Sequence, residues 1–243
     1  MATQVLTNAK VWLDSMDLTG DLNAVAIEQS VDMQEATTFG SDTKLSKPGM
    51  KSVKASLSGL INLGAGFSEE FLSSKIGLVD VPMSVGPMTG AEGEPGFSFL
   101  SSVASFTPVQ GGVGDIMKFK LDAAATSARL VRGTIVHNAV RTTTGNGTVF
   151  NIGAVAAGQF LYAVLHVTAI SGGPTVTVKV QSAPTVGFAA PTDRITFTAV
   201  TLKGSQWAVP IPGSITDAFW RATWSFSGGA SPSITFIVNV AIQ

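Results

Sequence analysis

The side chains that could carry out acid–base or metal chemistry are few in this sequence. It contains two histidines and no cysteine, which excludes thiolate nucleophiles, disulfides and zinc–thiolate sites. His137 and His166 lie in strand-like stretches, and neither has a second histidine or a carboxylate at the spacing of metal ligands. We therefore expect both to be ordinary strand residues, and we expect no metal or other cofactor.

Hydrolytic and phosphate chemistry also lack their motifs. A glycosidase needs two carboxylates across a cleft, and the C-terminal part of the chain has only Asp193 and Asp217. No G-x-S-x-G turn presents a serine nucleophile. The glycine-rich stretches at 111–115 and 144–148 lack the Gly-Lys-Ser/Thr ending of a phosphate-binding loop. An enzyme is therefore the weakest function class for this chain.

Three tryptophans, Trp207, Trp220 and Trp224, could form a platform on which a sugar stacks. Trp220 and Trp224 share parity with Ala222 and Phe226 in one strand-like stretch, the arrangement typical of core or interface residues. We favour a core role. A carbohydrate-binding module that contacts host surface glycans is kept as an alternative function.

The charge pattern argues against tight binding of nucleic acid. Only 13% of the residues are charged, and the formal net charge is −1. The Lys and Arg residues are dispersed and are not interleaved with aromatic residues, as a nucleic-acid groove would require. No apolar run reaches the roughly 18 residues of a membrane-spanning helix, and the N-terminus lacks the pattern of a secretory signal. We therefore expect the protein to begin in a cytoplasm.

The elements that would position these residues are mostly strands. The sequence is rich in Gly, Ser, Thr, Ala and Val, which favours strands and turns over long helices. Short segments of alternating polarity recur at regular intervals between 160 and 242, as in a sandwich or barrel. Only residues 66–78 predict a helix. A strand pair is expected at 10–33 and a hairpin at 116–138, so the predicted fold class is all-β with one short helix.

A change in composition predicts two domains. Residues 139–150 have the Thr, Gly and Asn content of a linker, and the balance of charge changes sign there. We assign residues 1–138 to a first β domain and 151–243 to a second, sandwich-like β domain.

The segment before one of the clearest strands has no period. Residues 52–63 alternate in polarity, with Val53, Ala55 and Leu57 on the side expected to be buried. Before them lie about twenty polar residues, and loops longer than roughly 12–15 residues are uncommon unless they are functional or disordered. We interpret residues 32–47 as a long functional loop.

This region carries a family resemblance. The stretch "VAIEQSVDMQEATTFGSDTKLSKPGMKSVKASLSGLINLG" resembles the tail tube (major tail) proteins of long-tailed bacteriophages of the siphophage type. In that family a strand leads into a T-T-F-G-type acidic and polar loop and then into a K-x-x-x-x-L-x-G strand. The resemblance covers about residues 1–138, through Thr37, Thr38, Phe39, Gly40, Asp42, Thr43, Lys44, Pro48, Gly49, Lys51, Leu57 and Gly59.

The resemblance implies a structural virion protein with a tail-tube-type sandwich or barrel. Copies of such a domain join into six-fold or quasi-six-fold rings, from six copies or from three duplicated ones, and the rings stack into a conduit for genome ejection. It implies self-association, contact with other tail proteins (tape measure, terminator and distal tail) and passage of genomic DNA without specific binding. The implied location is the virion tail, after assembly in the host bacterial cytoplasm, without a membrane.

The resemblance also assigns roles to residues. The inter-ring loop would contain Asp32, Glu35, Thr38, Phe39, Asp42, Lys44 and Lys47, and the ring-forming strand would contain Val53, Ala55 and Leu57. If the first domain forms the ring, a chain ending near Asn138 is expected to assemble. A capsid decoration or tail-adaptor protein, which would form a single ring or trimer, is the alternative from the same kind of particle.

Overall fold

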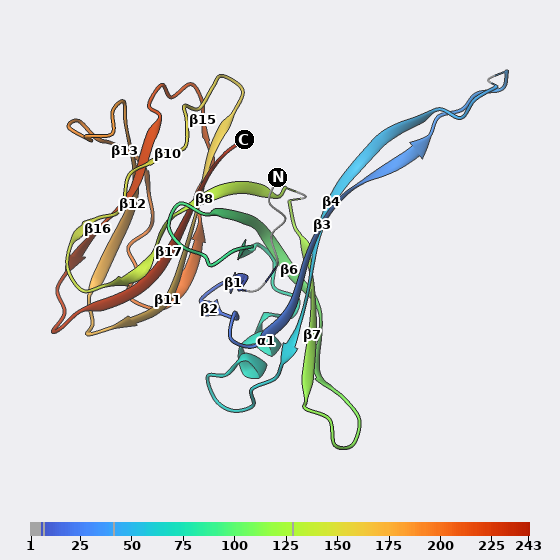
Figure 1. Ribbon diagram of the computed structural model, residues 1–243, viewed down its shortest axis with the longest axis horizontal. Helices are drawn as coiled ribbons and strands as arrows, with labels where there is room; N and C mark the ends of the chain where they lie inside the picture. Colours follow the sequence, from blue (N-terminus) through green and yellow to red (C-terminus); the bar gives the residue numbers. More distant parts are fainter. Residues whose placement is uncertain (1–5, 7, 41, 128) are drawn as a thin grey trace. The chain divides into compact units, whose positions relative to one another are not determined.

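The computed structural model describes residues 6, 8–40, 42–127 and 129–243. Its elements are seventeen strands and one helix, which confirms the predicted all-β fold class (Figure 1). Among the described residues, no helix is long and apolar enough to cross a membrane.

The chain divides into two compact units with interleaved boundaries. The first, here called the sandwich unit, contains the chain up to Gly20, Val81–Phe99 and Val131–Gln243. The second, the sheet unit, contains Asp21–Asp80 and Leu100–Leu130. Both sides of the predicted linker at 139–150 belong to the sandwich unit, so the units follow a different border from the predicted domains.

The sandwich unit consists of two sheets. One has the order β14–β11–β17–β8–β6–β5–β1–β2, with β15 also paired to β11. The other has the order β10–β16–β12–β13, with β9 also paired to β16. The strands are β1 (Lys10–Leu13), β2 (Met16–Asp17), β5 (Val81–Gly86), β6 (Pro95–Gln110), β8 (Val131–Arg141), β9 (Gly145–Asn146), β10 (Phe150–Asn151), β11 (Phe160–Ser171), β12 (Thr175–Ala183), β13 (Thr192–Thr196), β14 (Gly204–Trp207), β15 (Ile211–Pro212), β16 (Phe219–Ser227) and β17 (Ser233–Ile242).

The core of this unit is built from alternating strand residues. Val176, Val178 and Val180 of β12 are buried with Trp220 of β16 and Phe236 of β17 in one apolar cluster. The intervening residues of β12 are partly exposed. Alternation therefore places one side of each strand in the core, as expected from the sequence.

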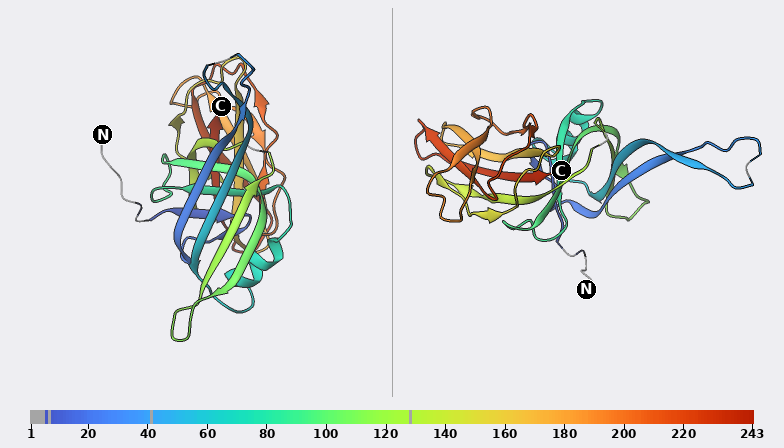
Figure 2. Two further views of the ribbon diagram at one scale, coloured as in Figure 1. Left: turned by 90° about the vertical axis from the view of Figure 1, so that its right-hand side faces the viewer. Right: turned by 90° about the horizontal axis from the view of Figure 1, so that it is seen from above.

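The sheet unit is a four-stranded antiparallel sheet with one helix. Its order is β3–β4–β7–β6, with β3 (Leu22–Glu35), β4 (Ser46–Leu60), β7 (Lys118–Ala125) and the second part of β6. The left-hand view of Figure 2 shows β3, β4 and β7 side by side. Val53, Ala55 and Leu57 of β4 are buried, which confirms the predicted alternation.

The segment 32–47 is the end of a β-hairpin, so its interpretation as a loop was wrong for 32–35 and 46–47, which are strand, and holds for the described residues between them. β3 continues to Glu35 and β4 begins at Ser46, which leaves residues 36–45 as the connection. The strands show no alternation here because most of their side chains are exposed on both faces. Their pairing depends on the backbone, which a polarity pattern does not report.

Two local predictions also need correction. The strands predicted at 116–138 form, but β7 pairs with β4 and β6, whereas β8 pairs with β6 and β17. In the predicted pair at 10–33, β1 pairs with β2 and β5, and β3 pairs with β4. The helix α1 (Ser68–Lys75) lies within the stretch 66–78 for which a helix was predicted.

Candidate assembly interface

The outer strand β3 has a long edge without a partner. It is 14 residues long, and β4 is its only pairing partner in the described part of the chain. The edge strands of the sandwich unit are much shorter: β13 has five residues, β14 has four and β2 has two. A long open edge offers unpaired N–H and C=O groups to another chain. The edge of β3 is therefore the strongest candidate for pairing between copies.

The opposite edge of the same sheet, the second part of β6, is also open, and its open residues align across the sheet with residues of β3. Ile76 forms a single β-bridge with Val103 of β6. Beyond Val103, β6 pairs with β7 and with no other strand among the described residues. Because each neighbouring pair in the order β3–β4–β7–β6 is antiparallel, β3 and β6 run antiparallel to each other. The register aligns Ala26–Ser56–Asp122–Ser105 in one row and Ala24–Ser58–Lys120–Thr107 in the next.

These rows form an exposed face of small and polar side chains. It contains a shallow hollow of about 410 Å³, lined by residues such as Ala26, Lys54, Ser56 and Asp122. Ser56 Oγ donates to Asp122 Oδ1 over 2.7 Å, and Lys120 Nζ lies 3.0 Å from Asp122 Oδ2. The hydrogen bond from Ser56, followed by that from Lys120, lowers the pKa of Asp122. The face is thus hydrated and mixed in charge.

The β3–β4 hairpin extends beyond the end of β7 (Figure 1). The last pair between β4 and β7 is Lys54 with Ala124, so among the described residues Ser46–Val53 of β4 pairs with β3 alone. Large apolar side chains are exposed along the hairpin: Met33, Phe39, Leu45 and Met50. The Phe39 side chain is fully exposed, with a relative solvent accessibility of 111%. An exposed aromatic side chain does not stabilise a monomer.

The predicted site residues divide between hairpin and core. Asp32 and Glu35 lie in β3 and Lys47 lies in β4, whereas Thr38, Phe39, Asp42 and Lys44 lie in the connection. Ala55 and Leu57 lie in the part of β4 that is flanked by β3 and β7, and Val53 lies next to the last pair with β7, Lys54 with Ala124. The flanked part of β4 has no free edge for a neighbouring copy. Edge pairing therefore requires β3 and β6, which the sequence interpretation did not identify.

His166 belongs to a buried polar network in the sandwich unit. Its Nδ1 donates to the carbonyl oxygen of Asp14 over 2.8 Å, so Nε2 accepts from Ser84 Oγ, also at 2.8 Å. Ser84 Oγ lies 2.7 Å from Ser98 Oγ, which accepts from Asn239 Nδ2 over 2.8 Å. The sequence prediction missed this network because its members are far apart along the chain.

His137 is also buried in the sandwich unit. Its Nδ1 lies 2.7 Å from Glu92 Oε1, and its ring packs against Trp224 and Phe236 with centroid separations of 4.7 and 4.3 Å. Burial lowers the pKa of His137 to about 4, although Glu92 opposes this shift. Both histidines are strand residues, as expected, and both serve the packing of this unit.

Burial of His166 should make the protein sensitive to acid. Burial lowers the pKa of His166 from 6.5 to about 4, although the Asp14 carbonyl opposes the shift. Between these pH values the unfolded chain binds the proton and the folded chain does not, so stability falls as the pH falls from 6.5 to 4. Through His166, the free energy of unfolding should decrease by about 3 kcal/mol over this pH range, since one pKa unit corresponds to about 1.4 kcal/mol.

Urea denaturation of the wild type and of His166→Gln at pH 7 and pH 4 measures this loss. The glutamine does not titrate in this range, whereas the carboxyl groups common to both proteins do. The difference in free energy of unfolding between the two pH values should therefore be about 3 kcal/mol smaller in His166→Gln. Equal losses in both proteins would contradict the assignment.

Two of the three tryptophans cannot stack on a sugar. Trp220 and Trp224 are 0% and 3% exposed, and their indole N–H groups donate to the backbone oxygens of Gly153 and Thr143. The carbohydrate-binding alternative is therefore wrong in assigning contact to Trp220 and Trp224. Trp207 is partly exposed and packs edge-on against Tyr162.

The carboxylates of the C-terminal half are both engaged. Asp193 accepts from Lys179 Nζ and Gln181 Nε2, both at 2.7 Å. Asp217 accepts from Ser182 Oγ at 2.7 Å and from Arg194. These hydrogen bonds lower the pKa of both carboxyl groups, whereas a general acid needs a raised pKa.

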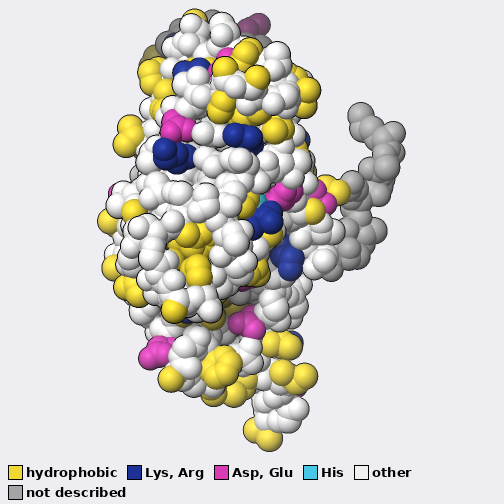
Figure 3. Space-filling model, turned by 90° about the vertical axis from the view of Figure 1, so that its left-hand side faces the viewer, with side chains coloured by type: hydrophobic (Ala, Val, Ile, Leu, Met, Phe, Trp, Pro, Cys, Tyr) yellow, Lys and Arg dark blue, Asp and Glu magenta, His cyan; other side chains and the backbone are white. Residues whose placement is uncertain are grey.

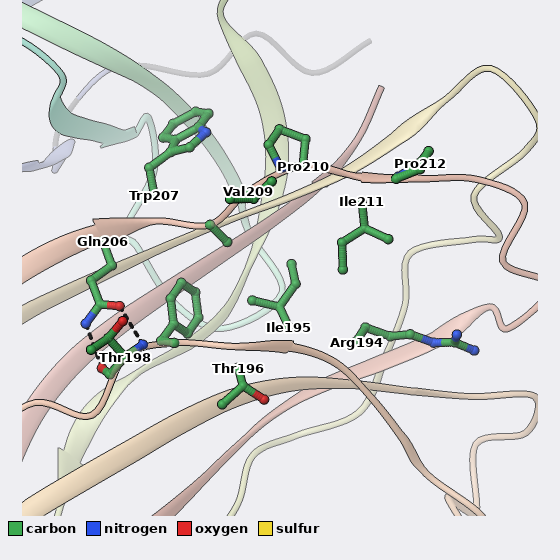
Figure 4. A pocket seen from close by; sticks show the side chains of 12 residues that line it. Arg194, Ile195, Thr196, Thr198, Gln206, Trp207, Val209, Pro210, Ile211 and Pro212 are labelled. Carbon is green, nitrogen blue, oxygen red and sulfur yellow. Dashed lines mark hydrogen bonds between the residues drawn. The ribbon is translucent and has the colours of Figure 1, made fainter.

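The sandwich unit has a hollow of about 430 Å³ between β13 and the β14–β15 segment. Figure 4 shows Ile195 and Ile211 on its apolar floor. The side chain of Gln206 bonds both the N–H and the carbonyl oxygen of Thr198, and Arg194 turns away to Asp217. Its main polar side chains are thus already bonded within the protein.

The charged side chains on the face drawn in Figure 3 lie scattered among uncharged and apolar ones. Lys and Arg do not gather into one basic patch on that face. This arrangement agrees with the dispersed basic residues in the sequence.

No protein-family model matches the sequence, and no curated protein matches it. Similar solved structures are components of virions and of an injection system. A chain of the virion of a native gene transfer agent particle has a TM-score of 0.42 and 17% identity, covering 53% of this chain and 97% of that chain. The Dit protein of phage SPP1 has a TM-score of 0.40 and 14% identity, and the match covers 97% of this chain and 99% of that chain. A chain of the sheath/tube terminator of the PVC extracellular contractile injection system has a TM-score of 0.44 and 15% identity, and the match covers 54% of this chain and 97% of that chain.

Proposed function

We propose that this protein is a structural subunit of a phage tail tube, located in the virion. The observation that carries the proposal is the sheet unit, with its two open edges on β3 and β6. Its place in a phage tail is supported by the resemblance of residues 25–64 to tail tube proteins. The function is structural, and it is exerted by the assembled copies.

Edge-to-edge pairing would join the sheet units into a ring. The edges run antiparallel, and the open part of β6 is level with Ala24 and Ala26 of β3. The β3 edge of one copy can therefore continue the sheet of the next in antiparallel order. Such an interface uses different surfaces on the two partners, and it closes into a ring when the rotation between copies divides the circle.

The remaining features of the sheet unit fit the other requirements of a tube. The polar face with Lys54, Ser56 and Asp122 would line the lumen, because it is exposed in the subunit and carries charges of both signs. DNA carries about one negative charge per 1.7 Å of axis, so a strongly basic lining would retain it. The protruding hairpin, with Phe39 exposed near its tip, would contact the next ring.

The partners that follow from this role are further copies of the chain and the tail proteins at each end of the tube. DNA would pass through the lumen without specific binding. An adaptor that forms one ring is the competing role, and it would use the same edges without stacking.

Microscopy with intact mass measurement tests the proposal. The purified wild type should form rings of one defined mass, and the rings should stack into tubes in negative-stain images. A protein that stays monomeric at high concentration would overturn the ring, whereas unstacked rings would favour the adaptor.

Two neighbouring proline variants test the β3 edge. Successive residues of a strand direct their N–H groups to opposite edges, so Val25→Pro and Ala26→Pro remove one outward N–H and one that faces β4. The variant that removes the outward N–H should keep the circular dichroism spectrum of the wild type and lose ring formation. Its proline ring also blocks the approach of a strand from the neighbouring copy. The variant that removes the N–H facing β4, and so weakens pairing within the sheet unit, is the control. Rings of normal mass from the folded variant would exclude β3 as the contact.

A further inference from the structure

The β3–β4 hairpin separates its charges by strand. Residues 28–42 contain Glu28, Asp32, Glu35 and Asp42 and no Lys or Arg, and are here called the acidic limb. Residues 43–54 contain Lys44, Lys47, Lys51 and Lys54 and no Asp or Glu, and are called the basic limb. Each limb thus has a single sign of charge over its whole length.

Pairing within the hairpin uses only part of these charges. Glu28 lies directly opposite Lys54, and Glu35 Oε2 lies 3.8 Å from Lys44 Nζ. The other two lysines face uncharged residues: Lys47 is opposite Gln34 and Lys51 is opposite Val31.

The carboxylates Asp32 and Asp42 also lack a cationic partner in the described part of the chain. Asp32 accepts a hydrogen bond from the side chain of its neighbour Gln34. Two carboxylates on one limb and two lysines on the other, Lys47 and Lys51, are therefore available to another molecule. Opposite charges facing each other across an interface favour the correct partner and register.

Both edges of the hairpin are open to such a molecule. β3 has no outer neighbour among the described residues, and β4 has none from Ser46 to Val53 because β7 ends below this level. The hairpin thus presents unpaired backbone groups and negative charge on one side, and unpaired backbone groups and positive charge on the other. A second copy of the same hairpin is complementary to both sides at once.

We infer that the hairpins of neighbouring copies associate limb to limb, the acidic limb of one copy against the basic limb of the next. The inference rests on the proposed assembly of copies and adds a specific contact to it. In a ring of edge-joined sheets, β7 and β6 separate the two limbs by about 14 Å at the usual strand spacing. The hairpins must lean together beyond the end of β7 to meet, and no described strand of the sheet unit pairs with them there.

Charge exchange between the limbs tests the inference. One variant reverses the two unpaired charges of the basic limb (Lys47→Glu with Lys51→Glu), a second reverses the two unpaired charges of the acidic limb (Asp32→Lys with Asp42→Lys), and a third combines all four changes. Arg132→Glu with Lys203→Glu, two exposed residues of the sandwich unit, is the control that alters net charge as much as the first variant. The protein concentration at half-assembly is measured by sedimentation, and folding by circular dichroism.

Each single-limb variant should need at least tenfold more protein to assemble than the wild type, because the charges left unpaired on the two facing limbs then have the same sign. The four-change variant should assemble as the wild type does, since complementarity is restored with the signs of the unpaired charges exchanged. A mixture of the two single-limb variants should also assemble, because the unpaired charges are all negative in one variant and all positive in the other.

Disulfide trapping gives the contact directly, because the natural chain has no cysteine. When Asp32→Cys chains are mixed with Lys51→Cys chains, a crosslinked dimer should form under assembly conditions and should be absent from the dilute mixture.

Two outcomes separate this inference from the proposed function. If the wild type forms rings and both single-limb variants assemble at its concentration, limb pairing is wrong while the ring stands; the charges then serve to block unwanted pairing at an open edge. If the wild type itself forms no ring, the proposed function fails, and the inference fails with it.

Discussion

A chain that ends at Asn138 should fail to fold, and should therefore form no rings. The cut falls within β8 and removes β11 and β17, which complete the sheet containing β1, β5 and the first part of β6. Trp12 and Ile135, each 1% exposed, would lose their partner Ile237. Losing the packing of one large buried side chain costs about 3–5 kcal/mol, and a domain has only about 5–15 kcal/mol in total.

The same cut also breaks buried hydrogen bonds. Ser84 would lose its partner His166, and Ser98 would lose its partner Asn239. Circular dichroism and urea denaturation measure the outcome, which should be no cooperative transition. The full-length chain with only residues 111–117 shortened is a suitable control, because that connection lies in the sheet unit. A cooperative transition and rings from the truncated chain would contradict this expectation and support the boundary predicted at 139–150.

Replacing residues 32–47 by a short Gly-Ser linker should stop stacking, while rings should still form, at the higher protein concentration that loss of the limb contacts requires. The remaining strands still pair from Leu22 with Gly59 to Val31 with Lys51, and the buried residues of β4 are untouched. The replacement removes exposed Met33, Phe39 and Leu45, the apolar surface proposed to contact the next ring. Phe39→Ala alone should weaken stacking by about 2 kcal/mol per contact, the usual threshold of a hot-spot residue.

Negative-stain microscopy and sedimentation of the wild type and both variants give the result. Rings of wild-type mass without tubes are expected from the linker variant, and shorter tubes from Phe39→Ala. Leu202→Ala, at an exposed apolar residue of the sandwich unit, is the matched control for the single substitution. Tubes of normal length from the linker variant would exclude the hairpin as the stacking contact.

The sequence by itself determined the local character of most strands. The alternation in Val176, Val178 and Val180 specified one buried face, and the same pattern placed Trp220 and Trp224 in the core. Period-two alternation is a local property of a half-buried strand, so it can be read without knowing the partner strand. The burial of Val53, Ala55 and Leu57 was predictable for the same reason.

The tertiary structure alone decided which strands are neighbours, and therefore where the open edges lie. β7 and β8 follow each other in the chain but do not pair with each other, and β3 and the second part of β6 become the two edges of the sheet unit although they are far apart in sequence. Strand pairing is made by backbone groups common to all residues other than proline, so it leaves little trace in the order of side chains. The strand ends at 32–35 and 46–47 were missed for a related reason: their side chains are exposed on both faces of the strands, so they do not alternate in polarity.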